Sequence, residues 1–202
     1  MKAVLLNCTL KRSPEPSSTE ALAGVVLRKL AAEGVQTQMI RVVDLDISPG
    51  VTSDEGDGDQ WPRIHAALLE AEILVVATPT WLGQPSSVTQ RVLERMDAML
   101  SETREDGTPV AYSRVAGVVV TGNEDGAHHI IAVVAQALID IGYTVPGQAW
   151  TYWNKGPGPG EEVYLNSDET DWSNSTGETA AINLVTVARA LQAHPIPAPP
   201  SS

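Results

Sequence analysis

Short apolar runs that alternate with amphipathic segments are the main pattern along this chain. Residues 3–6, 73–77 and 115–120 are apolar without interruption, which is typical of strands that are buried on both faces of a parallel sheet. A further strand is predicted over 35–43, and a short fifth strand is predicted to begin at 144–146, where a proline limits it. The stretches between these runs carry apolar residues at helical spacing. The pattern therefore predicts alternating strands and helices.

Residues that favour helix ends flank the amphipathic segments. Serine and threonine are good N-caps, and glycine often ends a helix. Pro62 suits the first turn of a helix that runs to about residue 70, and a fourth helix is predicted over 130–141. Ser17, in capping-box spacing with Glu20, is the predicted cap of the first helix, with Ser18 or Thr19 as alternatives. The other predicted caps are Ser86 or Ser87 and Ser175 or Thr176. The predicted helix ends are Gly34 and Gly142.

Five such strand–helix units in 202 residues predict one doubly wound α/β domain. A Rossmann strand order and a flavodoxin-like order both fit this count. The choice between them rests on the missing GxGxxG fingerprint and on a first loop that is rich in hydroxyl groups. We expect the domain to cover residues 1–194 and the proline-rich tail, 195–202, to be disordered.

Polar loops follow three of the predicted strands, and in open α/β sheets ligands bind just outside the carboxyl ends of strands. The first loop, 7–20, places hydroxyl groups with Lys11 and Arg12 before a helix start. Such a combination is competent to bind phosphate. The alternative is a polar capped turn without a ligand. The third loop, 121–129, is also polar and also follows a buried strand.

The second loop, 78–85, contains Pro79 and Pro85 and is expected to stop the strand before it. Trp81 lies beside Gly83 in this loop, where a flat aromatic surface adjoins backbone that a planar ligand can approach closely. The alternative is an ordinary connection whose tryptophan belongs to the core.

Residues 147–176 are predicted to form a long irregular segment over the site. It contains three of the five tryptophans and a 156–160 stretch of alternating glycine and proline, which we expect to be flexible. Loops of this length in compact domains tend to be lids or binding elements. We expect Trp150 and Trp153 to line the space that substrates occupy.

The charge balance of 13 basic against 25 acidic residues gives −12, which argues against nucleic acid or an anionic membrane as a partner. The acids cluster in two runs, 44–59 and 161–178, whose ordinary interpretation is a solvated surface, with a docking patch for a partner as the alternative. No charged-then-apolar leader opens the chain, and no apolar run approaches the roughly 18 residues of a membrane span. We expect a cytoplasmic protein.

One cysteine, Cys8, permits neither an internal disulfide nor a metal site of several cysteines, and we expect it to be a small buried hydrophobe. His128 and His129 suggest a metal site, but no third ligand has convincing spacing and neighbours on a helix do not face one another. We therefore predict no metal.

The three loops together resemble those of a known family. Thr9-Leu10-Lys11 with Ser17-Ser18-Thr19, then the Pro-Thr-Trp-Leu-Gly-Gln-Pro-Ser stretch at 79–86, then Thr121-Gly122 after a buried strand, resemble the flavodoxin-like NAD(P)H-dependent FMN reductases, whose relatives include quinone reductases. The resemblance covers about residues 2–145. It implies a flavodoxin-like doubly wound five-stranded parallel sheet with helices on both faces, and FMN as the cofactor.

The resemblance also assigns residues to parts of the cofactor. It implies Thr9, Lys11, Ser17, Ser18 and Thr19 at the phosphate, Pro79, Thr80, Trp81, Leu82, Gly83 and Gln84 along the ribityl chain and ring, and Thr121, Gly122 and Asn123 at the other side of the ring. Two departures stand out. Trp81 replaces the usual tyrosine, and Asn123-Glu124-Asp125 replaces a glycine-rich loop, where an acid near the flavin would disfavour its anionic reduced form.

The activity implied is hydride transfer from NAD(P)H through FMN to a small acceptor such as a quinone or free flavin. His128 could donate a proton to the reduced flavin or the acceptor, although a capping or surface role is the simpler interpretation. Family members are commonly dimers or tetramers, so a homodimer or homotetramer is implied. The alternatives are a flavodoxin-type electron carrier without its own NAD(P)H site, and a degenerate domain used for assembly.

Overall fold

The structure is a computed structural model that describes residues 1–156, 158 and 160–200. Strands and helices alternate along the chain as the apolar pattern predicts. The strands are β1 (Lys2–Asn7), β2 (Gln36–Arg41), β3 (Ile73–Trp81), β4 (Gln84–Pro85), β5 (Val115–Gly122) and β6 (Trp150–Asn154). The α-helices are α1 (Ser18–Ala32), α2 (Trp61–Glu70), α3 (Ser87–Met96), α4 (Ala127–Ile141) and α5 (Asp171–Ala193), and the 3-10 helices are η1 (Val42–Asp44), η2 (Asp97–Leu100) and η3 (Tyr164–Asn166).

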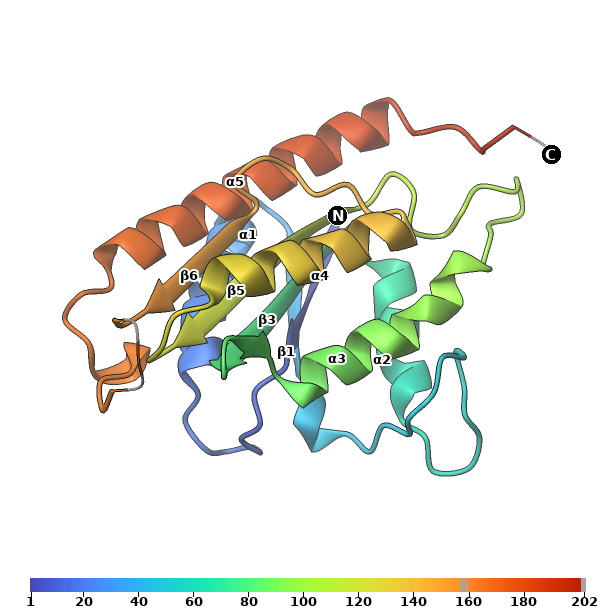
Figure 1. Cartoon of the computed structure of the whole chain (residues 1–202). Coiled ribbons are helices and arrows are strands. Elements are labelled where there is room, and N and C mark those ends of the chain that lie inside the picture. Colours follow the sequence, from blue (N-terminus) through green and yellow to red (C-terminus); the bar gives the residue numbers. More distant parts are fainter. Residues whose placement is uncertain (157, 159, 201–202) are drawn as a thin grey trace.

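Five parallel strands form the centre of the molecule in the order β2-β1-β3-β5-β6, and β4 pairs only with β3. Helices α1 and α5 cover one face of the sheet, and α2, α3 and α4 cover the other (Figure 1). Counted over the parallel strands alone, this is the strand order of flavodoxin and not of the Rossmann fold. The predicted flavodoxin-like, doubly wound, five-stranded sheet with helices on both faces is confirmed.

The central strands supply both cores, because successive side chains of a strand point to opposite faces. Val4 and Leu6 pack with α2, α3 and α4, whereas Leu5 packs with α1 and α5. Asn7 at the end of β1 is level with Ala77 in the sheet. The loops that leave β1, β3 and β5 therefore meet at one edge of the sheet, where a flavodoxin-like fold has its crevice.

Strand β3 continues to Trp81, so the prediction that it stops at residue 77 is wrong. Ala77 accepts the N–H of Cys8 on the β1 side, and alternate residues point the same way, so Pro79 faces a side where β1 has already ended. The missing N–H of Pro79 therefore costs no hydrogen bond between strands. Beyond it, Trp81 pairs with Gln84 of β4 in a tight hairpin.

The fifth strand is β6, not a strand at 144–146. Thr144 makes only an isolated bridge to Val115, whereas Trp150 to Asn154 pair along β5. The expectation of an irregular segment over 147–176 is therefore wrong at β6, at η3 and at the start of α5. Of the stretch that we expect to be flexible, Pro157 and Pro159 lie outside the described residues.

Several helix boundaries agree with the predicted caps. Ser17 Oγ accepts the N–H of Glu20 at 3.2 Å, and Ser86 Oγ accepts the N–H of Thr89 at 3.1 Å. Gly142 closes α4 in the left-handed region. By contrast, α5 begins at Asp171, earlier than a cap at Ser175 or Thr176 would allow.

One further expectation needs correction. Asp59 belongs to the acidic run that we expect to be solvated, yet its side chain is 0% exposed and pairs with Arg95 Nη2 at 2.7 Å. In the tail, the N–H of Ile196 donates to Ser113 Oγ at 2.8 Å, and Ser201 and Ser202 lie outside the described residues. The expected disorder of the tail stays a prediction.

Candidate functional site

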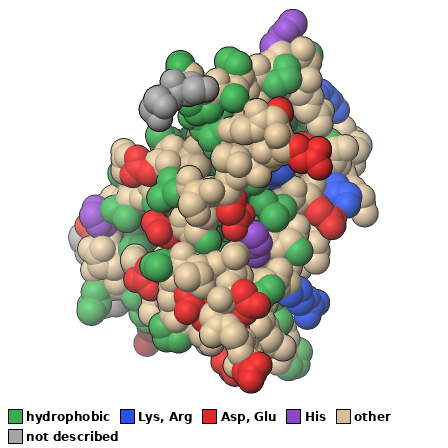
Figure 2. Space-filling view, turned by 90° about the vertical axis from the view of Figure 1, so that its right-hand side faces the viewer, with side chains coloured by type: hydrophobic (Ala, Val, Ile, Leu, Met, Phe, Trp, Pro, Cys, Tyr) green, Lys and Arg blue, Asp and Glu red, His purple; other side chains and the backbone are tan. Residues whose placement is uncertain are grey.

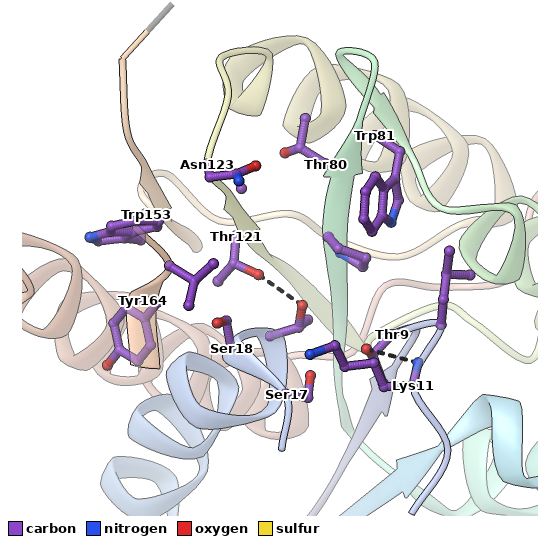
Figure 3. Close-up of a pocket in the computed structure, with 15 residues that line it drawn as sticks. Thr9, Lys11, Ser17, Ser18, Thr80, Trp81, Thr121, Asn123, Trp153 and Tyr164 are labelled. Carbon is purple, nitrogen blue, oxygen red and sulfur yellow. Dashed lines mark hydrogen bonds between the residues drawn. The ribbon is translucent and has the colours of Figure 1, made fainter. Parts of the chain in front are cut away.

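A cavity of about 240 Å³ opens where β1, β3 and β5 end (Figure 3). All three polar loops contribute to it. The structure brings together most of the predicted residues, namely Thr9, Lys11, Ser17, Ser18, Thr19, Pro79, Thr80, Trp81, Thr121, Gly122, Asn123 and Trp153. Leu10, Val163 and Tyr164 also line the cavity, and the sequence does not single them out.

The first loop presents donors at the start of α1. The first N–H groups of a helix have no partner within it. Ser17 Oγ accepts the N–H of Glu20, which leaves the N–H groups of Ser18 and Thr19 at the cavity. Lys11 adds a positive charge, and its Nζ lies 3.5 Å from Glu15 Oε1. The helix dipole and these groups together favour an anion here.

Arg41, at the end of β2, braces the first loop from outside the cavity. Its Nη1 donates to the carbonyl oxygens of Lys11 at 3.3 Å and Glu15 at 2.9 Å. Its Nε donates to Glu20 Oε2 at 2.9 Å, and the same oxygen accepts from Asn7 Nδ2 at 3.1 Å. Sequence reasoning missed this brace because Glu20 fits a capping box equally well, and nothing local links residues 41 and 11.

The second loop supplies a flat wall to the cavity. Trp81 is 55% exposed, so its indole is held by few neighbours. Thr80 is buried, and its Oγ1 has no hydrogen-bond partner among the described residues. A Cβ at Gly122 would lie only 2.8 Å from that oxygen, so only glycine lets β3 and β5 approach so closely here.

The opposite wall comes from Thr121, Trp153 and η3. Thr121 Oγ1 lies 2.8 Å from Thr19 Oγ1, which ties β5 to the start of α1. Trp153 is 4% exposed, and its Nε1 donates to the carbonyl oxygen of Glu169 at 3.1 Å. Its ring meets the ring of Tyr164 edge-on, with centroids 6.3 Å apart. Trp153 is thus a core residue that also lines the cavity.

Tyr164 is fixed by a bond that points away from the cavity. Its hydroxyl donates to Asn174 Oδ1 at 2.6 Å. Partial burial raises the pKa of this phenol, so it stays protonated at neutral pH. No local signal in the sequence marks the residue, because η3 reaches the cavity only through the long connection after β6.

Three residues of the second loop lie outside the cavity, contrary to expectation. Leu82 and Gly83 form the tip of the β3–β4 hairpin, and Leu82 is 90% exposed. Gln84 turns toward α4, where its Oε1 lies 3.2 Å from His129 Nε2. None of the three is among the residues that line the cavity.

His128 and Trp150 also lie elsewhere. Trp150 points to the α4 face of the sheet because alternate residues of β6 face opposite ways. There its ring centroid is 5.9 Å from that of His128, which is also 5.0 Å from Tyr152. Their predicted places at the substrate and at the flavin are not supported by this arrangement. No group of three metal-ligating side chains occurs among the described residues.

Cys8 is fully buried beneath the first loop, and burial raises the pKa of its thiol to about 12. The prediction of a small buried hydrophobe is confirmed. A thiol with so high a pKa does not serve as a nucleophile at neutral pH.

Comparison with known proteins places this cavity in context. The model of a family described as NADPH-dependent FMN reductase matches residues 1–157. The 8-demethyl-8-aminoriboflavin-5'-phosphate synthase of Streptomyces davaonensis is 34% identical over 206 residues, which cover 96% of this chain and 80% of that protein. A crystal structure of RosB with bound 8-demethyl-8-formylriboflavin-5'-phosphate has a TM-score of 0.88 at 34% identity and covers 97% of this chain and 82% of its own.

Two further matches bear on extent and on fold. A Mycobacterium bovis protein named divalent metal cation transporter MntH is 39% identical over 201 residues, which cover 96% of this chain but only 29% of that protein. None of the helices that the structure describes is long and apolar enough to cross a membrane. An NADH:FMN oxidoreductase structure, with TM-score 0.63, 16% identity and coverage of 94% and 89%, shows the fold alone.

The residues at the cavity fit a flavin phosphate. The donors and charge of the first loop suit a phosphate ester, and the indole of Trp81 beside the close approach at Gly122 suits a planar ring. The family match over residues 1–157 and the 34% identical relative show that the chain belongs to the NADPH-dependent FMN reductase family.

Proposed function

We propose that the protein binds FMN in this cavity and with it reduces a small acceptor, such as a quinone or free flavin, at the expense of NAD(P)H. The observation that carries the proposal is the meeting of a helix start able to bind phosphate and an aromatic wall in one cavity. When bound, FMN would supply the redox chemistry. The protein's own residues would bind it, orient it and keep water from part of its ring.

The phosphate of FMN would lie at the first loop. Thr9→Ala combined with Lys11→Ala should weaken FMN binding by about 3–6 kcal/mol, because hydrogen bonds to charged groups contribute roughly 1.5–3 kcal/mol each and two such groups are removed. Calorimetric titration of the two apo proteins with FMN measures the difference. Wild-type affinity in the double variant would remove this loop from the site.

The ring would lie between Trp81 and the strand ends at Thr80 and Gly122. Trp81 offers its face, and Gly122 keeps the backbone low where a side chain would collide with Thr80. Stacking on an aromatic face contributes roughly 0.5–1.5 kcal/mol beyond the buried area. The open side of the cavity would then admit the nicotinamide and the acceptor in turn.

Anaerobic titration tests the electron donor. If NADPH or NADH bleaches the flavin absorbance of the loaded protein within seconds and without a second protein, the reductase proposal stands. A flavodoxin-type carrier would bind FMN equally well but would need a partner reductase. Failure of the apo protein to bind FMN at all would overturn both.

The Streptomyces davaonensis relative favours a second candidate. Its name states that it makes a riboflavin 5'-phosphate altered at position 8, and the RosB structure holds a compound altered at the same position. On this alternative, FMN is the substrate and not a resident cofactor. Mass spectrometry of the flavin recovered after prolonged incubation separates the two, because a resident cofactor keeps its mass and a substrate does not.

Assembly and location are further proposals that rest on the family. We infer that residues 1–194 act as one FMN-binding domain, that the protein forms a homodimer or homotetramer, and that it works in the cytoplasm. Sedimentation of the loaded protein tests the assembly, and a monomer at micromolar concentration would overturn it.

A further inference from the structure

The third loop holds the hairpin that carries Trp81. Glu124 Oε1 accepts the backbone N–H of Leu82 at 2.7 Å. Leu82 adopts a φ of 53°, in the left-handed region that non-glycine residues seldom occupy. With its side chain 90% exposed, Leu82 gains little from packing. The bond to Glu124 is thus one of the contacts that offset the cost of this turn.

Two neighbouring contacts hold the same turn. A Cβ on Gly126 would lie 2.7 Å from Gly83 Cα, so the third loop and the hairpin tip are in close backbone contact. Gln84 Oε1 lies 3.2 Å from His129 Nε2 at the start of α4. Residues 82, 83 and 84 are therefore each tied to the segment that follows β5. Trp81 comes directly before them and lines the cavity (Figure 3).

The direction of the Glu124 carboxylate decides between two roles. As an acid in a loop beside the cavity, it could act through its charge on a bound flavin. In the structure it is bonded to Leu82 and is not among the residues that line the cavity. We propose that Glu124 is a positioning residue, which fixes the wall formed by Trp81 through the N–H of Leu82 and does not tune the flavin by its charge. This inference rests on the proposed FMN site.

Two substitutions of Glu124 distinguish the length of its side chain, which the bond to Leu82 needs, from its negative charge. Glu124→Gln keeps an oxygen at the same distance and removes the charge, whereas Glu124→Asp keeps the charge and shortens the side chain. We expect Glu124→Asp to weaken FMN binding about tenfold, the effect of losing one hydrogen bond to a charged group, and Glu124→Gln to stay within about threefold of wild type. Asp125→Ala is the matched control, because it removes one charge from the same loop and Asp125 accepts no bond from a described side chain or N–H.

Amide hydrogen exchange of Leu82 in the apo proteins gives a second readout that does not depend on FMN. It should speed up in Glu124→Asp and stay slow in Glu124→Gln and Asp125→Ala. Unchanged exchange in Glu124→Asp overturns the inference whether or not FMN binds, so its failure is distinct from failure of the proposed function. If the flavin midpoint potential and FMN affinity shift in Glu124→Gln and Asp125→Ala but not in Glu124→Asp, which keeps the charge, the role is charge and the inference is wrong. Equal losses in all three variants would also overturn the inference. Melting curves of the three variants exclude unfolding as the cause.

Discussion

Trp81 and Trp153 are the two tryptophans that line the cavity, and their surroundings give them different roles. Trp81 is 55% exposed at a hairpin end, while Trp153 is 4% exposed and donates its N–H to the carbonyl oxygen of Glu169. An exposed aromatic face gains most when a ligand covers it. A buried indole contributes to the fold before any ligand arrives.

Alanine at each position should therefore produce opposite effects. Trp81→Ala should leave the melting temperature of the apo protein nearly unchanged and weaken FMN binding by about 1–2 kcal/mol. Trp153→Ala should lower the free energy of unfolding by about 3–5 kcal/mol, the usual cost of emptying a core site. Thermal melts beside flavin titrations measure both quantities. Strong destabilisation of the apo fold by Trp81→Ala, with normal FMN binding by what remains folded, would contradict the proposed wall.

Asp59 and Arg95 show how the fate of a charged residue depends on contacts distant in sequence. Arg95 Nη1 also donates to the carbonyl oxygen of Ser48 at 2.9 Å, and its guanidinium lies 5.5 Å from the centroid of the Trp61 ring. Burial alone would raise the pKa of the Asp59 carboxyl. The bonds from Arg95 and from the backbone N–H groups of Glu55, Trp61 and Ser48 outweigh it and hold this pKa well below its usual value.

The lowered pKa gives a prediction for acid stability. Because the folded pKa lies below the unfolded value, the pair stabilises the fold at pH above about 4, and this contribution is lost as the pH falls through the folded pKa. Asp59→Asn should lower the free energy of unfolding at pH 7 by about 3–5 kcal/mol, because Arg95 is left buried without its partner. Urea unfolding at several pH values measures both. If Asp59→Asn lowers the free energy of unfolding by no more at pH 7 than at a pH below the folded pKa, the pair does not stabilise the fold.

Most elements follow from the sequence because local signals and burial agree. The apolar runs at β1, β3 and β5 and the caps at Ser17 and Ser86 were predictable for that reason. The end of β3 was not, since whether Pro79 can extend a strand depends on where β1 stops. β6 reads Trp-Thr-Tyr-Trp-Asn, a strand-forming composition, but its glycine-rich and proline-rich surroundings favoured a loop.

The candidate site divides in the same way. Residues next to strand ends could be placed from sequence, because parallel strands of one sheet end together. Val163, Tyr164 and Arg41 could not, because they reach the cavity or its loop through connections that only the folded chain defines. Leu82, Gly83 and Gln84 do not line the cavity, because they form the tip and the return strand of the tight hairpin, which the sequence does not indicate.

Arg41 supports the first loop from the end of β2, and a substitution can show whether this support or the positive charge of Arg41 matters for FMN binding. Arg41→Ala should weaken FMN binding by about 1–2 kcal/mol, because the carbonyl oxygens of Lys11 and Glu15 lose their donor and the first loop loses its fixed shape. Arg63→Ala, on the exposed face of α2, is the control for loss of one positive charge. Calorimetric titration with FMN compares them, and equal losses in both variants would make the effect one of net charge.

Across the whole molecule, the acidic residues do not form one functional class. Asp59 pairs with Arg95, Glu20 holds Arg41, and Asp44 accepts from the N–H of Ser13 at 2.9 Å. Others lie free at the surface. Figure 2 shows acidic side chains spread over one face, with basic ones mainly toward its edge. Because several acidic side chains bond to groups within the protein, they are less available to dock a basic partner. This arrangement fits a reductase with a small acceptor better than an electron carrier.

Reversing exposed acids that make no side-chain bond to described residues tests this directly. Asp46, Asp57 and Asp168 meet that condition, and changing all three to lysine moves the net charge from −12 to −6, since each reversal adds two. Turnover with a small neutral quinone should stay within about twofold of wild type, because exposed charges at this distance are screened at physiological salt. Reduction of a basic protein acceptor serves as the comparison, measured at low and high salt. A large loss confined to the protein acceptor and strongest at low salt would mean that the acidic surface steers a partner, as in a carrier.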